Sequence, residues 1–394
     1  MIGITIFAAT DVTLSVQCVN LCTVDEISDP KRRVHANFAR KGNSVNHIYL
    51  PYIIGGDSPI PYLFEKITPH MNEELFVPTI YRFEGEEFYT NFIETVQMSN
   101  TNKLQRILQY GRTSLKNYDL IHTGGHAPRH IPISKCSRIR NPNIRHIHSF
   151  RVDVNPDSNF QTDRRQQLAE MADMTTAVSK HTATTVKQEF GFDPIVIYNG
   201  VDTDLFHSNY EKPPLLSRLD KNDPVFMFVG SLDSRKRPSD IIKVARQVPE
   251  ATFLLIGDGP LYENLIAESR DLENVHLTGR IDKKRLPAIY ANATGFLFPT
   301  IREGCPNVVL EAMASGLPVV GYETTSMPEL VTTGKTGYLA SPCDVNQLAE
   351  HVRSICENSD VTAMGEQARN YIEENHTFEN IAAQYESLYL ELLE

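Results

Sequence analysis

The C-terminal half of the sequence alternates short apolar runs with helix-forming stretches, and this alternation limits the possible folds more than any other feature. Residues 225–229 and 252–256 are continuous apolar runs that end at a glycine, as buried parallel strands do. Further strands are expected at 275–277, 295–298 and 318–320, and helices at 241–248, 286–293 and 306–315. Alternation at this short spacing predicts βα units on a doubly wound parallel sheet, in the α/β class.

The N-terminal half alternates more loosely, with strands expected at 2–8, 45–50, 119–122, 144–149, 174–178 and 195–198. The span from 51 to about 115 contains five prolines and predicts a long excursion across one face of a sheet. Residues 207–223 are polar, include Pro213 and Pro214, and are expected to form a linker. A chain of 394 residues suits two such α/β domains, which would bind ligands in a cleft at the strand ends.

Charge and apolar content exclude several classes of function. The net charge of -11 disfavours generic nucleic-acid binding, which needs a basic surface. The sequence contains no run of about 18 apolar residues that could span a membrane. The first residues lack the positive start of a signal peptide, and the six cysteines are scattered, so we expect reduced thiols and a cytoplasmic location.

Segment 303–320 carries the most specific chemistry in the sequence. Pro306 is expected in the first turn of a helix, where its missing N–H costs nothing. The free N–H groups near Asn307 and Val308 would then face the cleft and hold a diphosphate. Glu311, further along the helix, can accept hydrogen bonds from two ribose hydroxyls, and Glu303 at the cleft mouth can reach a sugar.

This segment resembles the E-x7-E motif of retaining glycosyltransferases with the GT-B fold, a large family that includes sucrose synthase and many bacterial and archaeal mannosyl- and glucosyltransferases. Segments 229–236, 257–260, 275–279, 327–329, 334–339, 173–179 and 197–206 are also similar to family patterns. The resemblance covers roughly residues 119–150 and 170–394 and is more specific in the second stretch.

The resemblance implies a fold of two Rossmann-like domains, residues 1–206 and 207–376, with a last helix at 377–394 that crosses back to the first domain. It implies transfer of a hexose from a UDP- or GDP-sugar with retention of configuration, without metal or cofactor. The catalytic residues would be Glu303, Lys236 and His148. The residues that bind the donor would be Ser231, Arg235, Arg237, Gly257, Gly279, Arg280, Ile281, Gly304, Cys305, Pro306, Asn307, Val308 and Glu311.

The sequence departs from the family pattern at two places. Ser231 stands where many members have an arginine, so that Arg235 or Arg237 would supply the charge. The expected first strand–helix turn, residues 8–11, has small residues but no glycine. Asp202 and Asp204 have the spacing of a metal-binding pair, but they lie in an Asn-Gly-Val-Asp turn that aspartate commonly caps.

Three other functions compete with transfer: a nucleotide-sugar epimerase, a binding protein that has lost catalysis, and a dehydrogenase. The intact Glu303/Glu311 pair and the Asn-Gly-Val-Asp crossing disfavour the epimerase, and the intact glutamates and lysine disfavour the binding protein. The absence of G-x-G-x-x-G spacing after Gly257 disfavours the dehydrogenase. The sequence leaves two kinds of acceptor open, a neutral soluble molecule and an anionic, membrane-linked one. The second alternative, which would place the protein at the inner membrane face, rests on basic residues concentrated between 122 and 165, namely Arg129, Lys135, Arg138, Arg140, Arg145, Arg151, Arg164 and Arg165.

Overall fold

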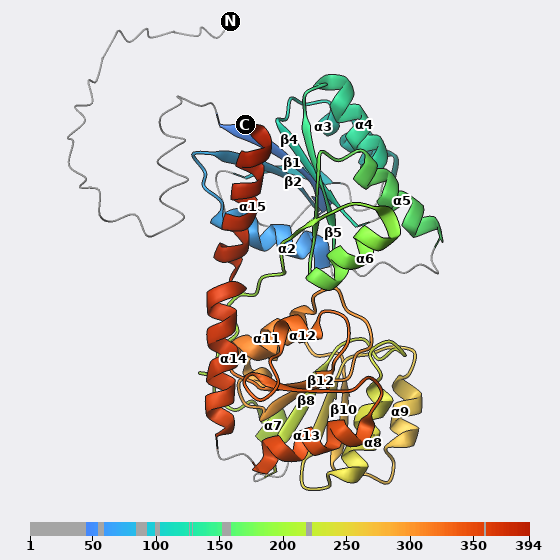
Figure 1. The fold of residues 1–394 in the computed structure, drawn as a ribbon, viewed down its shortest axis with the longest axis vertical. Coiled ribbons are helices and arrows are strands. Elements are labelled where there is room, and N and C mark those ends of the chain that lie inside the picture. The colour runs from blue at the N-terminus through green and yellow to red at the C-terminus, as the bar shows by residue number, and fades with distance from the viewer. Residues whose placement is uncertain are drawn as a thin grey trace, which may run out of the picture. The chain divides into compact units, whose positions relative to one another are not determined.

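A computed structural model describes residues 45–53, 59–83, 93–98, 103–125, 127, 129–151, 159–217, 223–357 and 360–394. These residues form two parallel β-sheets with helices packed against them (Figure 1). The expected strand at 2–8, the turn at 8–11, and Cys18 and Cys22 lie outside the described residues. The α/β class and the parallel arrangement expected from the sequence are confirmed.

The first sheet has seven strands among the described residues, in the order β3-β2-β1-β4-β5-β6-β7. The strands are β1 (Asn46–Ile53), β2 (Phe76–Phe83), β3 (Glu94–Met98), β4 (Leu120–Gly124), β5 (Arg145–Phe150), β6 (Met174–Ala177) and β7 (Ile195–Val196). The helices between them are α2 (Pro59–Ile67), the short 3-10 helix η1 (Thr68–His70), α3 (Lys103–Ser114), α4 (His130–Arg140), α5 (Asn159–Glu170) and α6 (Lys180–Phe190). Strands β4 to β7 lie where the sequence predicts them.

The second sheet has six strands among the described residues, in the order β10-β9-β8-β11-β12-β13. They are β8 (Val225–Val229), β9 (Thr252–Ile256), β10 (Val275–Gly279), β11 (Gly295–Phe298), β12 (Val319–Tyr322) and β13 (Gly337–Ala340). The helices around it are α7 (Pro214–Ser217), α8 (Pro238–Gln247), α9 (Tyr262–Glu268), η2 (Lys283–Arg285), α10 (Leu286–Tyr290), α11 (Asn307–Ala314), α12 (Met327–Leu330) and α13 (Val345–Glu357). The two apolar runs at 225–229 and 252–256 are confirmed as fully buried central strands.

The chain ends in two long helices, α14 (Val361–Asn375) and α15 (Phe378–Leu393). Helix α14 packs on α11 of the second sheet, whereas α15 packs on α2 and η1 beside the first sheet (Figure 1). The break between them is fixed because the Thr377 side chain accepts a hydrogen bond from the Asn380 N–H and caps α15. The expected boundaries at 206/207 and 376/377 remain predictions.

The excursion expected between 51 and about 115 is wrong for the described part of that span. Strands β2 and β3 instead continue the first sheet beyond β1 as parallel strands. Pro78 lies inside β2, opposite Ile48, in a strand that has neighbours on both sides. Proline cannot donate to a ladder and usually argues against a central strand, which is why the sequence pattern is misleading here.

Candidate functional site

Two loops that follow strands of the second sheet bring the candidate residues together. Residues 230–237 follow β8, and residues 299–306 follow β11, which pairs directly with β8. Gly257 and Gly259, which follow β9, lie against the backbone of the first loop. A Cβ at Gly257 would lie 1.8 Å from the Gly230 oxygen, and a Cβ at Gly259 would lie 2.6 Å from the Leu232 oxygen, so neither position has room for a side chain. The glycines therefore allow a close backbone approach that positions the residues beyond Leu232.

Lys236 and Glu303 form an ion pair at the point where the two loops meet. The Lys236 Nζ donates to Glu303 Oε1 at 2.5 Å and lies 4.5 Å from the centre of the Phe298 ring. Both side chains are about nine-tenths buried, at 11% exposure each. The pair thus places one fixed cation and one carboxylate together in a site from which most water is excluded.

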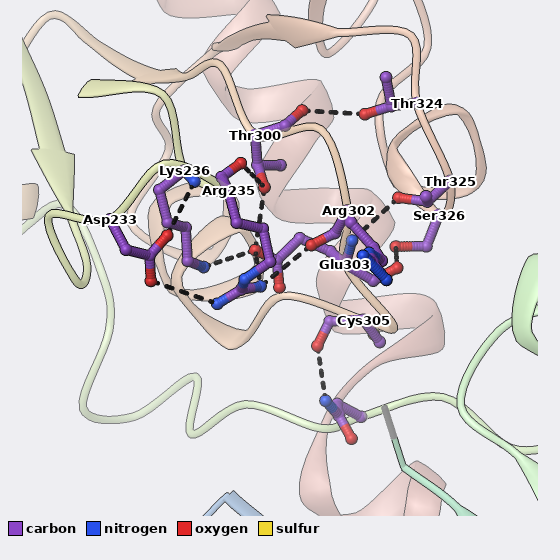
Figure 2. A network of polar contacts seen from close by, with 11 residues as sticks. Asp233, Arg235, Lys236, Thr300, Arg302, Glu303, Cys305, Thr324, Thr325 and Ser326 are labelled. Atoms are coloured by element: carbon purple, nitrogen blue, oxygen red, sulfur yellow. Dashed lines mark hydrogen bonds and ion pairs between the residues drawn. The ribbon is translucent and has the colours of Figure 1, made fainter. Parts of the chain in front are cut away.

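Four further polar groups fix Glu303 (Figure 2). The Arg235 Nη1 and the Thr300 hydroxyl each donate to Glu303 Oε1 at 3.0 Å. The Glu303 N–H donates to the Thr325 hydroxyl at 3.1 Å, and the Ser326 hydroxyl donates to the Glu303 carbonyl at 3.3 Å. The carboxylate therefore has a defined orientation before any substrate contacts it.

A hydrogen bond within its own loop fixes the backbone of Lys236, and burial shifts the pKa of its ammonium group. Its N–H donates to Asp233 Oδ1 at 3.1 Å. Burial lowers the pKa of the Lys236 ammonium, and the adjacent Glu303 carboxylate opposes this effect. Glu303 therefore helps to keep Lys236 charged in a buried position.

The N-terminus of α11 offers free backbone donors. Pro306 occupies the N-cap position with an extended backbone, one residue before the first-turn position expected from the sequence. The N–H groups of Asn307 and Val308 have no hydrogen-bond partner among the described residues, and the first bond back to Pro306 comes from Val309. Two adjacent N–H groups at a helix N-terminus form a typical anion-binding site.

Glu311 lies in the middle of α11 and is half-buried. The Tyr290 hydroxyl donates to Glu311 Oε2 at 3.1 Å. Burial raises the pKa of Glu311 to about 7, and the hydrogen bond from Tyr290 opposes the rise. This carboxylate can therefore change its protonation state near neutral pH.

The two arginines that the sequence left as alternatives have different surroundings. Arg235 contacts Glu303, as described above, and is exposed. Arg237 begins α8 with a left-handed backbone and pairs through Nε with Asp240 Oδ2 at 2.5 Å. Asp240 also accepts from the Tyr322 hydroxyl and from Lys243. Arg235 is thus the arginine that lies beside the Lys236–Glu303 pair.

The remaining candidates lie at strand ends of the second sheet or inside the first. Gly279 ends β10 with a left-handed backbone, and its carbonyl accepts from the Gly257 N–H at 2.9 Å. Ser231 and Arg280 are exposed, and Ile281 is half-buried. Within the described residues, these positions make no hydrogen bond or ion pair with Glu303.

His148 is fully buried within β5 and does not contact the Lys236–Glu303 pair. Its Nδ1 hydrogen-bonds the Thr123 hydroxyl of β4 at 2.9 Å, and its Nε2 has no partner among the described residues. Burial holds the pKa of His148 well below its usual range, so the ring is neutral. The acidic turn also has a structural role, because Asp202 Oδ1 accepts from the Asp204 and Leu205 N–H groups, which confirms the expected cap.

Sequence reasoning missed the residues that support these groups. Thr300, Thr325 and Tyr290 lie in stretches without a recognisable pattern, and each acts through a single hydroxyl. Asn199 could have been found, because it stands in the Asn-Gly-Val-Asp turn. Its side chain donates to the Cys305 carbonyl at 2.7 Å and to Asn307 Oδ1 at 2.8 Å.

Comparison with known families matches most of the described chain. The family described as "Glycosyl transferases group 1" matches residues 216–376, and "Glycosyltransferase Family 4" matches residues 64–205. These two ranges include β4 to β13 and every described residue of the site.

Similar curated proteins cover part of the chain. A sulfoquinovosyl transferase of Arabidopsis thaliana is 31% identical over 181 residues, which are 44% of this chain and 35% of that protein. An N-acetyl-alpha-D-glucosaminyl L-malate synthase of Bacillus anthracis is 26% identical over 57% of this chain and 61% of its own length. A GDP-mannose-dependent phosphatidylinositol monomannoside mannosyltransferase of Mycolicibacterium smegmatis is 30% identical over 53% and 60%. The chain spans less than two thirds of each of these relatives.

Solved structures share the whole described fold. Anabaena HepE in complex with UDP superposes with a TM-score of 0.72 and 20% identity, covering 88% of this chain and all of that one. Sucrose-phosphate synthase from Thermosynechococcus elongatus superposes with a TM-score of 0.70 and 19% identity, covering 88% and 99%. At this identity the likeness establishes the fold alone.

Proposed function

We propose that this chain, which belongs to the group 1 glycosyltransferases and has their GT-B fold, transfers a sugar from a nucleotide-diphosphate sugar to an acceptor. The observation that carries the proposal is the Lys236–Glu303 ion pair beside the free N–H groups of α11. The cation and the backbone N–H groups needed to hold and stabilise a leaving diphosphate therefore come from neighbouring loops of the second sheet.

Each group has a distinct role in this proposal. The N–H groups of Asn307 and Val308 bind the diphosphate, and Lys236 stabilises the charge that develops on it as the sugar departs. Glu303 accepts hydrogen bonds from hydroxyls of the transferred sugar, while Glu311 accepts them from the ribose. Arg235 adds a second cation at the mouth of the site.

We further propose a UDP- or GDP-hexose donor and transfer with retention, without metal. The names of similar proteins support both nucleotides, since HepE was solved with UDP and the mycobacterial relative is described as GDP-mannose-dependent. The fixed cation and the helix N-terminus supply the charge stabilisation that a divalent metal supplies in other phosphate chemistry. Attack from the face of the departing phosphate would retain the configuration.

Donor screening tests the function directly. UDP, GDP and ADP are each added to the purified protein during thermal unfolding. The matching diphosphate should stabilise the native state by about 2.7 kcal/mol at a hundred times its Kd. The corresponding nucleotide sugars are then supplied with candidate acceptors in EDTA, and the product anomer is assigned by NMR.

The outcomes separate the competing functions. Diphosphate binding without transfer to any acceptor would favour a binding protein. Interconversion of the free sugar would favour an epimerase, and an inverted product would contradict retention. If none of the three diphosphates raised the unfolding temperature, the proposed donor site would be wrong.

The acceptor proposal rests on a mixed basic and apolar surface around α4. Lys135, Arg140 and Arg145 are exposed, and Ile139 between the first two is 76% exposed. Three other basic residues between 122 and 165 do not add to this exposed set. Arg138 donates to the Met171 carbonyl, and Arg151 and Arg165 are buried. We propose that the exposed set attracts an anionic membrane that carries a lipid-linked acceptor. Separately, no helix of the described residues is long and apolar enough to span a membrane.

Flotation with liposomes tests this surface. The protein should float with phosphatidylglycerol vesicles at low salt, and binding should fall in 1 M salt and with phosphatidylcholine alone. Replacing Lys135, Arg140 and Arg145 by alanine should lower binding more than tenfold, since each basic residue contributes about 1 kcal/mol near an anionic surface. The matched control replaces Arg270, Lys284 and Lys335, which are also exposed, and should float like the parent. Equal losses in both variants, or no flotation at all, would favour a neutral soluble acceptor.

A further inference from the structure

Arg151 is a buried cation at the end of the first sheet. It directly follows β5 and is only 7% exposed. Its Nη1 donates to the Tyr385 hydroxyl of α15 at 3.1 Å, and its Nη2 donates to the side-chain oxygen of Asn199. Both partners are neutral, so these hydrogen bonds orient the guanidinium without neutralising it.

No carboxylate pairs with Arg151 among the described residues. A charge taken out of water loses several kcal/mol of hydration unless an opposite charge compensates it. Other arginines of the chain follow this rule, since Arg237 and Arg369 each have a carboxylate partner. An unpaired, oriented guanidinium of this kind is suited to receive an anion from outside the protein.

The surroundings of Arg151 indicate which anion would reach it. Asn199, which accepts from Arg151, donates in turn to the Cys305 carbonyl and to Asn307 Oδ1 at the start of α11. One carboxamide therefore joins the guanidinium to the helix N-terminus with the free N–H groups. The positive charge of Arg151 also acts on Cys305, just before this helix. Burial raises the pKa of the Cys305 thiol to about 12, and Arg151 opposes that rise.

We propose that Arg151 is a further donor-binding residue, which contributes a cation from the first sheet to the diphosphate held at the α11 N-terminus. The inference rests on the proposed function. Lys236 and Arg235 would then stabilise the diphosphate from the second sheet, and Arg151 would do so from the first. Because Asn199 spans the two elements, diphosphate binding would also strengthen the junction between them.

Binding of matched ligands to the full chain tests the proposal. UDP and GDP are titrated into the parent, and the tighter of the two is compared with its own nucleoside, which lacks phosphates. Arg151→Gln should weaken diphosphate binding at least about tenfold, the effect of losing one hydrogen bond to a charged group. Nucleoside binding should change less than about twofold, because neither base nor ribose contacts Arg151 in this proposal.

Three variants serve as controls. Arg151→Lys keeps the charge but loses the planar fork, so it should lose less diphosphate affinity, and it carries the test if the glutamine variant does not fold. Tyr385→Phe removes a neutral partner and should bind the diphosphate within a few-fold of the parent. Arg270→Gln removes the same charge at an exposed position and should bind like the parent.

Two outcomes would overturn the inference while leaving the proposed function intact. One is a parent that binds the diphosphate and an Arg151→Gln variant that binds it equally well. The other is an equal loss for the diphosphate and the nucleoside, which would mean that Arg151 only maintains the local structure. A parent that binds neither diphosphate would overturn the proposed function, and this inference with it.

Discussion

Replacing Lys236 or Glu303 by alanine is expected to lower kcat about a hundredfold or more, while the protein still folds. The physical reason is that each residue supplies a fixed charge in a site with little water, and removal of one such group typically costs two to three orders of magnitude in rate. The measurement is steady-state transfer from the nucleotide sugar identified by the donor screen, with circular dichroism to verify folding.

The pair should act as a unit, and this provides a sharper check. In Glu303→Gln the carboxylate that opposes the effect of burial is gone, so the pKa of Lys236 should fall further. Lys236 must be protonated to act, and activity should therefore be lost at lower pH than in the parent as the pH rises. Lys243→Ala removes an exposed lysine that pairs with Asp240 and should retain parental kcat. Parental kcat in both Lys236→Ala and Glu303→Ala would contradict the site.

Donor binding is expected to weaken as the pH falls through about 7, because Glu311 must be ionised to accept from two ribose hydroxyls. The pKa of Glu311 is raised to about 7, so the carboxyl is protonated below that pH and loses acceptor capacity. Calorimetry with the intact nucleotide sugar measures the effect, since both phosphates are esterified and do not titrate there. Below the midpoint, Kd should rise about tenfold for each pH unit until weak binding to the protonated form takes over.

Two variants of this site should respond in opposite ways. Glu311→Gln should bind weakly at every pH and show no midpoint. Tyr290→Phe removes the hydrogen bond that opposes the rise in pKa, so its midpoint should move to higher pH. A parent whose Kd is constant between pH 5 and 9 would show that Glu311 does not contact the donor.

The second sheet was predictable because its elements are local and regular. β8 and β9 are unbroken apolar runs, and α11 begins where Pro306 predicts. The first sheet was harder to read, since Pro78 interrupts β2. Its helix α3 also exposes Ile107 and Leu108, so its apolar residues do not all mark the buried face.

The site was predictable where charge and helix geometry coincide and unpredictable where one hydroxyl or amide acts. The sequence pointed to Lys236, Glu303 and the start of α11, which the structure brings together. It could not distinguish Arg235 from Arg237, because that depends on which way each side chain leaves the same loop. The hydroxyl partners of Glu303 and Glu311 come from segments up to 23 residues away, and only the tertiary structure reveals them.

Helix α15 has a consequence for how the protein matures during synthesis. The Tyr389 hydroxyl hydrogen-bonds His122 of β4 at 2.7 Å across 267 positions of the chain, and Tyr385 holds Arg151. The interior of the first sheet therefore cannot be completed before α15 has been synthesised. The strands of both sheets pair with partners at similar distances along the chain, so it is α15 that delays completion of the first sheet. The first sheet therefore waits for a helix that follows every strand of the second sheet in the sequence.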